Sequence, residues 1–260
     1  MQRLSDISTI RAVMEKNGFS FSKALGQNFL INPSVCPRMA EMSGAADCAG
    51  AIEVGPGIGV LTYELSQVAK KVVTIELDKR LLPVLDETLA DCDNVKVVND
   101  DAFTYVQNSK ATYDVALIDL VDPSNEKLAK LYSTEFYRNI EARLAPEGVM
   151  VTQATSTFFS PHAFSTVAST VAAAQPDRQI LPFSTNIPSF GEWGFVLSTR
   201  TPQNLISQPL PQGLTYQDRK TLEFIMRTKP ARTEFMEPST LLHPRIVEVY
   251  NQDMRQWRYY

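Results

Sequence analysis

From residue 51 onward, short apolar runs alternate with segments whose apolar residues recur three or four positions apart. Short apolar runs predict buried strands, and the longer spacing predicts helices. Strands are expected at Ala51–Glu53, Val72–Glu76, Val95–Val98, Asp114–Ile118 and Gly148–Thr152. Helices are expected at Val60–Val68, Arg80–Ala90, Asn125–Leu144 and Pro161–Ala174. This alternation predicts a doubly wound α/β fold, with a mostly parallel sheet and helices on both of its faces.

Other patterns flank this alternation. Helical spacing of apolar residues predicts a helix that ends near Gly18 and another over Pro33–Met42. Two apolar runs around a Pro/Gly turn, between Ile180 and Arg200, predict an antiparallel edge hairpin. Thr201–Gly213 is rich in Pro and Gln and is interpreted as a linker, and a tail with helical spacing follows it. We therefore expect a helical segment at 1–50, a Rossmann-like domain at 51–200, and a linker with a helical tail packed on that domain at 201–260.

Composition narrows the class of protein. With 260 residues, 44% of them hydrophobic, the chain can bury a full core. No apolar run approaches the roughly 20 residues of a membrane span, and the first residues lack a signal-peptide pattern. Three cysteines without a C-x-x-C spacing indicate neither a disulfide framework nor a zinc site. We expect a cytoplasmic protein without a membrane segment.

The charge balance is acidic. A net charge of −4 and a pI of about 5.3 weigh against a broad nucleic-acid surface, leave a local basic patch open, and favour a small cationic substrate. The two histidines, His162 and His243, have no acid or cysteine at ligand spacing, so no metal site is expected. Arg255, Trp257 and the last three residues permit RNA stacking, but packing or a homodimer contact is the simpler interpretation.

The most informative motif is the segment AIEVGPGIG at Ala51–Gly59. A strand that ends at the acidic Glu53 is followed by Gly55, Gly57 and Gly59, and then by a helix. Glycine lets a ligand lie against the main chain, and the helix start offers free N–H groups. NAD, FAD and other adenosine ligands fit such a turn. The G-x-G-x-G spacing with its preceding acid favours S-adenosylmethionine, and Glu76, at the end of the second strand, is placed to accept ribose hydroxyls.

Residues from about 21 to 101 resemble the small-subunit ribosomal RNA adenine dimethyltransferases. The motifs SKALGQNFL, EVGPGIGVLT, VVTIELDKRL and VVNDDA follow that family's order and spacing. The resemblance implies a cofactor site in which an amide pair contacts the methionine end, glycines border the cofactor, one acid holds the ribose and another bonds the adenine amine. These positions are Gln27 and Asn28, Gly55 and Gly57, Glu76, and Asp101 with the adjoining Ala102.

This chain departs from that family at its catalytic turn. The family's N-L-P-Y motif holds and stacks on the target adenine, whereas the chain has DVALIDLVDP, with Asp119 and Asp122 at the corresponding positions. The family's basic, helical C-terminal domain also has no counterpart. The segment that resembles the methyltransferases therefore lacks their catalytic chemistry.

From about Asp101 onward the chain resembles the aminopropyltransferases, the spermidine and spermine synthases. The resemblance rests on DAFTYV, YDVALIDLVDP, LYSTEFY, LAPEGVMVTQATS, NIPSFGEWGF and HPRIVEVYNQDMRQW. Such enzymes transfer an aminopropyl group from decarboxylated S-adenosylmethionine to a polyamine amine. A protonated amine must lose a proton before it attacks, and a carboxylate at the end of a strand can accept that proton.

By this resemblance, Asp119 is the base and Asp122 a partner that holds the substrate or the adenosine side. Rings that line a slot for the polyamine's methylenes and ammonium groups are expected at Tyr132, Tyr137 and Trp193, and Gln153 orients the amine. Alternatives stay open at these positions. The two aspartates also suit a turn with a helix cap, and the aromatic residues also suit plain core packing.

The aminopropyltransferase pattern fails at the glycine turn. There the family has G-G-G-D-G, whose acid binds the amine of the decarboxylated donor, and this chain has Ile58 instead. The family's N-terminal β-domain is also absent from the sequence. The donor half thus matches S-adenosylmethionine and the acceptor half matches polyamine chemistry, with a seam near Asn99–Ala102. A recombined or engineered chain is the simplest account of that seam.

These observations predict aminopropyl transfer to a polyamine amine by direct displacement. The donor is S-adenosylmethionine or its decarboxylated form, and it is expected on Gly55–Gly59, Glu76 and Asp101. One alternative function is adenine dimethylation of ribosomal RNA, and another is a folded chimera that binds the nucleoside without turnover.

Overall fold

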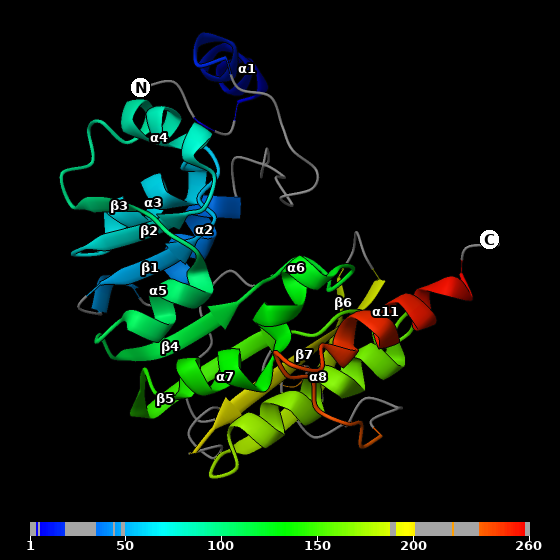
Figure 1. The fold of residues 1–260 in the computed structure, drawn as a ribbon. Coiled ribbons are helices and arrows are strands. Elements are labelled where there is room, and N and C mark those ends of the chain that lie inside the picture. Colours follow the sequence, from blue (N-terminus) through cyan, green and yellow to red (C-terminus); the bar gives the residue numbers. More distant parts are fainter. Residues whose placement is uncertain are drawn as a thin grey trace. The chain divides into compact units, whose positions relative to one another are not determined.

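The computed structural model describes residue 4 and residues 6–18, 35–43, 45–47, 50–187, 191–200, 220 and 234–257. The chain divides into two compact units, Met1–Tyr105 and Val106–Tyr260 (Figure 1). Every strand of the described residues belongs with its hydrogen-bonded partners to one unit or the other. The boundaries expected at residues 50 and 200 stay predictions, and the expected linker lies outside the described residues.

The first unit is built on a three-stranded parallel sheet in the order β1-β2-β3. Its strands are β1 (Ala51–Val54), β2 (Val72–Glu76) and β3 (Val95–Asn99), close to the predicted spans. Its helices are α1 (Ile7–Lys16), α2 (Val35–Met42), the 3-10 turns η2 (Ala45–Asp47) and η3 (Lys79–Leu81), α3 (Val60–Val68) and α4 (Leu82–Thr88). Helix α5 (Ala102–Asn108) starts in this unit and crosses the boundary.

Helix α1 contributes to the interior of the first unit. Ile10 and Met14 of this helix are buried in one hydrophobic cluster with Ile58 of the glycine turn, whose side chain is fully enclosed. Lys16 Nζ lies 2.7 Å from Glu87 Oε1, which ties the end of α1 to α4. Ile58 is therefore a packing residue of this cluster.

The second unit holds a four-stranded mixed sheet in the order β4-β5-β7-β6. Its strands are β4 (Tyr113–Ile118), β5 (Leu144–Gln153), β6 (Gln179–Ile187) and β7 (Gly191–Thr199). β4 and β5 are parallel, and β7 is antiparallel to both β5 and β6, so the predicted antiparallel hairpin at the sheet edge is confirmed. Two long helices, α8 (Pro161–Ala174) and α11 (Arg245–Arg255), pack against each other in this unit (Figure 1).

The prediction of a single helix over Asn125–Leu144 is wrong. The segment forms α6 (Glu126–Ala129), the 3-10 turn η4 (Lys130–Tyr132) and α7 (Thr134–Glu141). The break falls at Ser133, which has extended backbone angles and whose Oγ accepts a hydrogen bond from the N–H of Phe136. A serine in this role caps a new helix. The chain therefore changes direction at Ser133, although the spacing of its apolar residues continues.

A buried arginine ties β5 and β7 to α7. The Arg178 guanidinium is about 1% exposed, donates to Ser198 Oγ at 3.0 Å and to the carbonyl of Gly148, and lies 3.3 Å from Glu141 Oε2. Glu141 Oε1 lies 2.9 Å from the partly exposed Arg200. One carboxylate is thus shared by a buried and an exposed arginine.

Candidate active site

The glycine turn has the backbone that its residues predict. Gly55, Gly57 and Gly59 have φ angles of 74°, 59° and 86°, a region that side chains with a Cβ rarely adopt. The N–H of Gly55 donates to the Ile75 carbonyl of β2 at 2.9 Å, and Gly59 is the N-cap of α3. A Cβ on Gly59 would also lie 3.2 Å from Leu89 Cδ2. The turn therefore requires glycine for its backbone, independently of any ligand.

Two acids lie beside this turn. Glu53 on β1 accepts a hydrogen bond from Thr62 Oγ1 at 2.5 Å, and burial, assisted by the charge of Glu76, raises its pKa to about 7. Glu76, at the end of β2, is 6% exposed, and burial raises its pKa as well. The N–H of Asp78 donates to Glu76 Oε1 at 2.7 Å, and the N–H groups of Leu77 and Gly57 also lower the pKa of Glu76. Glu76 is thus held in place by main-chain donors, and its contact with a ribose stays a prediction.

The raised pKa of Glu53 predicts a pH-dependent stability. The unfolded chain releases this proton near pH 4.5 and the folded chain near pH 7, so the folded state loses stability as the pH rises through that window. We expect wild type to lose ~2–3 kcal/mol between pH 4.5 and pH 8 through this group, and Glu53→Gln to lack that loss. Urea unfolding across the window measures it. Asp86→Asn, which removes an exposed carboxylate of α4, should keep the wild-type slope, and a Glu53→Gln slope equal to wild type would contradict the assignment.

The remaining donor-side residues are placed as follows. Asp101 precedes α5 and its Oδ1 accepts the N–H of Thr104 at 3.3 Å, so it caps the helix whose first residue is Ala102. Gln27 and Asn28 lie outside the described residues. Their contact with the methionine end of a cofactor stays a prediction.

In the second unit, the two candidate aspartates follow β4. Asp119 is exposed to solvent at the end of the strand, yet partial burial of its carboxyl raises its pKa. Asp122 Oδ2 accepts a hydrogen bond from Tyr250 Oη at 2.9 Å. Its other oxygen, Oδ1, is buried and meets no donor of the described residues with full hydrogen-bond geometry, although the Gln153 amide lies close enough to lower the pKa of the carboxyl. A buried carboxylate oxygen with free acceptor capacity suits a cation or an N–H donor.

The charge state of Asp122 follows from its neighbours. Burial raises its pKa most, and the charge of Asp119 raises it further. Tyr250 and the Gln153 amide lower the pKa. Because the two carboxyls are neighbours, the second of them ionises less readily than the carboxyl of an isolated aspartate. A bound ammonium group would favour the form in which both are ionised.

Gln153, at the end of β5, braces the loop that carries both aspartates. Its Nε2 donates to the Leu120 carbonyl and to Tyr132 Oη, each at 2.6 Å. Its Oε1 accepts from the N–H of Thr155 at 2.8 Å and from Trp193 Nε1 at 3.2 Å. Both donors and both acceptor sites of the amide are thus occupied. Gln153 holds the loop in place, and its predicted role in orienting the amine stays a prediction.

The predicted aromatic residues fall into two groups. Tyr132 is buried and its Oη donates to the Val121 carbonyl at 3.0 Å, so it belongs with Trp193 to the network around Gln153. Tyr137 is fully buried, lies edge-on to Phe136 and faces Thr152 Oγ1 at 3.4 Å. The structure brings Tyr132, Gln153, Trp193 and Asp122 together and places Tyr137 in the interior beside them.

Sequence reasoning missed Tyr250 and Thr155. Tyr250 lies 128 residues after Asp122 in the chain, and the helical spacing of the tail gave no indication of which face meets the site. Thr155 has a φ of 66°, which is costly for a β-branched residue. Its N–H is held by Gln153 and its carbonyl accepts the N–H of Gly194 at 2.7 Å, so the strained backbone is fixed from both sides.

The described residues form neither a cluster that could hold a metal ion nor a helix that could span a membrane. Within those ranges no group of three or more His, Cys, Asp and Glu side chains lies close enough to hold a metal ion. The helices in the same part of the chain are all too short or too polar to span a bilayer.

Together, the strand orders of the two sheets, the glycine turn after β1 and the acids at the ends of β2 and β4 define an α/β transferase fold of the class I S-adenosylmethionine-dependent type. Solved structures agree on this fold. Spermidine synthase from Thermotoga maritima matches with a TM-score of 0.52 at 18% identity, over 74% of this chain and 70% of that one. An O-methyltransferase from Bacillus cereus matches with a TM-score of 0.50 at 16% identity, over 75% and 91%.

The chain belongs to the family of the spermine/spermidine synthase domain, whose model matches residues 51–208. Polyamine aminopropyltransferase 1 of Streptomyces coelicolor is 34% identical over an alignment of 220 residues that covers 79% of this chain and 40% of that protein. Ribosomal RNA small subunit methyltransferase A of Bacillus cytotoxicus is 52% identical over 101 residues, 38% of this chain and 35% of that protein. The chain thus spans about two fifths or less of the length of these curated relatives, and the resemblance to both families in one chain is confirmed.

Proposed function

We propose that the protein transfers an aminopropyl group from an S-adenosylmethionine-type donor to the amine of a polyamine. The observation that carries this proposal is the aspartate pair after β4. Asp119 is open to solvent, and Asp122 has a buried carboxylate oxygen without a hydrogen-bond partner among the described residues. The match to the synthase family over residues 51–208 supports it. The acceptor of such a site is a small cation, in keeping with the net charge of −4.

The reaction is a direct displacement at carbon. The amine nitrogen forms a bond to the aminopropyl carbon attached to the sulfonium, and the C–S bond breaks with its electron pair going to sulfur. The amine must first be neutral, so Asp119 accepts a proton from the ammonium group. The exposed position of Asp119 gives the acceptor a route to the base, and the neighbouring Asp122 adds a second carboxylate that favours a cationic acceptor.

On the donor side, Glu76 holds the ribose, Gly55–Gly59 border the cofactor, and Asp101 with Ala102 lies at the adenine. The main-chain donors that fix Glu76 support its part in this assignment. Ile58 bears on which form of the donor binds, S-adenosylmethionine or its decarboxylated form. Ile58 supplies no charge for the amine of the decarboxylated form, and its place in the hydrophobic cluster of α1 leaves the glycine turn without an acid of its own at that position.

Calorimetry tests the donor assignment. We expect decarboxylated S-adenosylmethionine to bind and, with putrescine added, to yield a longer polyamine detected by chromatography. Asp86→Asn, which changes an exposed carboxylate of α4 outside the donor residues, is the control and should bind the donor as wild type does. Binding of S-adenosylmethionine at least tenfold tighter than the decarboxylated form, without polyamine product, would remove the aminopropyl donor from the proposal.

One observation favours a second candidate. The 52% identity over 101 residues to a ribosomal RNA methyltransferase supports S-adenosylmethionine itself as donor and adenine as the methyl acceptor. Asp119 and Asp122 stand against it, because the carboxylates replace the amide and the ring that would hold the base. Salt-dependent binding of a ribosomal RNA helix together with methyl transfer to it would favour this candidate.

A further inference from the structure

The last described helix, α11, lies along the loops that follow β4 and β5. Tyr250 and Asp253 of this helix, and Trp257 two residues beyond its end, are spaced three and four apart and so lie on one side of it. Each of them bonds to a different point of those two loops or of the helix start behind them. This side is therefore fixed at three points along its length.

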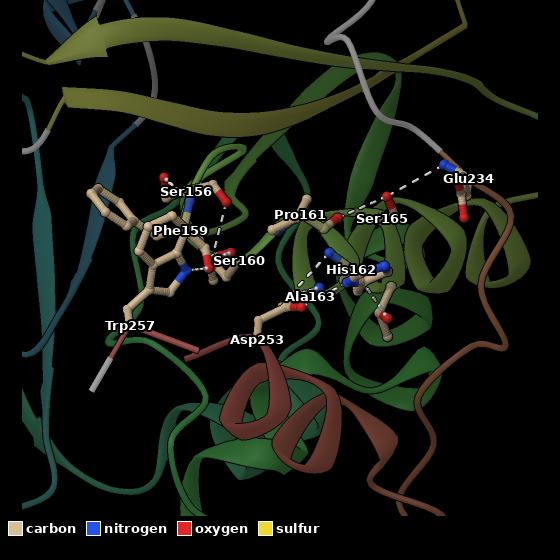
Figure 2. Close-up of polar contacts among 12 residues, drawn as sticks. Ser156, Phe159, Ser160, Pro161, His162, Ala163, Ser165, Glu234, Asp253 and Trp257 are labelled. Carbon is tan, nitrogen blue, oxygen red and sulfur yellow. Dashed lines mark hydrogen bonds and ion pairs between the residues drawn. The ribbon is translucent and has the colours of Figure 1, made fainter. Parts of the chain in front are cut away.

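One of these points lies at the start of α8, and another lies at Phe159, two residues before it (Figure 2). Asp253 Oδ2 accepts the N–H groups of His162 and Ala163 at 3.0 and 2.9 Å, and Oδ1 lies 2.7 Å from His162 Nδ1. Asp253 is 3% exposed, so a buried carboxylate from another helix caps α8. Trp257 Nε1 donates to the Phe159 carbonyl at 2.9 Å. These contacts hold α11 in one position relative to the loop after β5.

The third point is Tyr250. Its Oη donates to Asp122 Oδ2 at 2.9 Å, and the neighbouring Asn251 Nδ2 donates to the Ser124 carbonyl of the same loop at 3.3 Å. A hydroxyl that occupies one carboxylate oxygen fixes the direction of the other one. With Oδ2 engaged by Tyr250 and Oδ1 buried, the Asp122 carboxylate is held in one orientation beside Asp119.

We propose that Tyr250 is a positioning residue of the acceptor site, which holds the Asp122 carboxylate in its place and charge state beside Asp119, while Asp253 and Trp257 hold its helix in place. The inference rests on the proposed function for the identity of the substrate, and on contacts within the second unit for the geometry. Tyr250 acts through Asp122 and needs no contact with the substrate.

The groups that face Asp122 come from three elements besides its own loop. Asp119 faces it from the loop, Tyr132 from η4, Gln153 from β5 and Tyr250 from α11. Asp119 raises the pKa of Asp122, and the hydroxyl of Tyr250 and the amide of Gln153 lower it. Removing the hydroxyl alone therefore moves the titration of Asp122 to higher pH, with the other groups unchanged.

The experiment compares Tyr250→Phe with wild type in protein carrying ¹³Cγ-labelled aspartate. We expect the Asp122 resonance to titrate at higher pH, and the acidic limb of kcat/KM for putrescine to move the same way. Loss of one hydrogen bond to a charged group should lower kcat/KM by roughly 10–100-fold, mainly through KM. Asn251→Ala, which removes the neighbouring link to the same loop, should leave the Asp122 titration in place.

An Asp122 titration that Tyr250→Phe does not move overturns the proposal. This measurement needs no turnover. If the wild-type protein does not transfer an aminopropyl group, the proposed function is wrong, and the Asp122 resonance still decides whether Tyr250 positions Asp122. If Tyr250→Phe does not fold, the reciprocal variant Asp122→Asn serves, with ¹³Cζ-labelled tyrosine. The pKa of Tyr250, raised by burial and by the Asp122 charge, should then fall, and an unchanged value overturns the proposal.

Discussion

Replacing Asp119 by Asn is expected to lower the rate of aminopropyl transfer by roughly 10²–10⁴-fold while leaving donor affinity nearly unchanged. The amide keeps the size and hydrogen-bonding oxygen of the side chain but cannot accept the amine proton. Initial rates with a saturating donor and putrescine measure the first effect, and calorimetry measures the second. The site of the change is exposed, so the fold should tolerate it.

The pH profile of wild type gives a second check on the same residue. Partial burial raises the pKa of Asp119, so the ionised, active form should be lost on acidification at a higher pH than for an ordinary aspartate. Asp114→Asn, at the exposed start of the same strand, is the matched control and should retain full activity. Full turnover by Asp119→Asn would exclude Asp119 as the base.

Replacing Arg178 by Met is expected to destabilise the protein by ~3 kcal/mol, the largest effect on stability that we predict. The change removes the buried guanidinium and leaves the Gly148 carbonyl and Ser198 Oγ without their donor. It also takes one of two cations from Glu141. Urea unfolding measures the free energy of unfolding.

Arg200→Met is the matched control, because Arg200 contacts the same carboxylate from a position where its side chain is 44% exposed. An exposed ion pair contributes little, so this change should cost less than ~1 kcal/mol. Equal losses in the free energy of unfolding for the two variants would mean that the burial of Arg178 does not determine how much it stabilises the protein.

The strands could be predicted from sequence because each buried strand is a short apolar run. Val72–Glu76 was predicted at its observed bounds, and the hairpin between Ile180 and Arg200 was predicted from two such runs around a turn. The helix over Asn125–Leu144 was not predicted correctly. The spacing of apolar residues continues unchanged across Ser133, although this residue caps a new helix that runs in another direction.

The candidate site was predictable in its residue types and not in its connections. The resemblance of the motif after β4 to the aminopropyltransferases pointed to Asp119 and Asp122, and their roles stay predictions. The bonds that determine their chemistry join distant segments: Gln153 lies 33 residues from Leu120 in the chain, and Tyr250 lies 128 residues from Asp122. Tertiary packing sets such partners, and no spacing rule contains them.

The border between the two units separates no pair of strands that hydrogen-bond to each other in the described residues. It falls at Tyr105 and Val106, a few positions after the turn that both resembled families share. Each side keeps its own sheet, so a crossover of coding sequence at this point divides α5 but preserves the strand ladders of the described residues. Shuffling either half against the corresponding half of a relative should therefore yield folded proteins more often than shuffling at any point within β1–β3 or β4–β7.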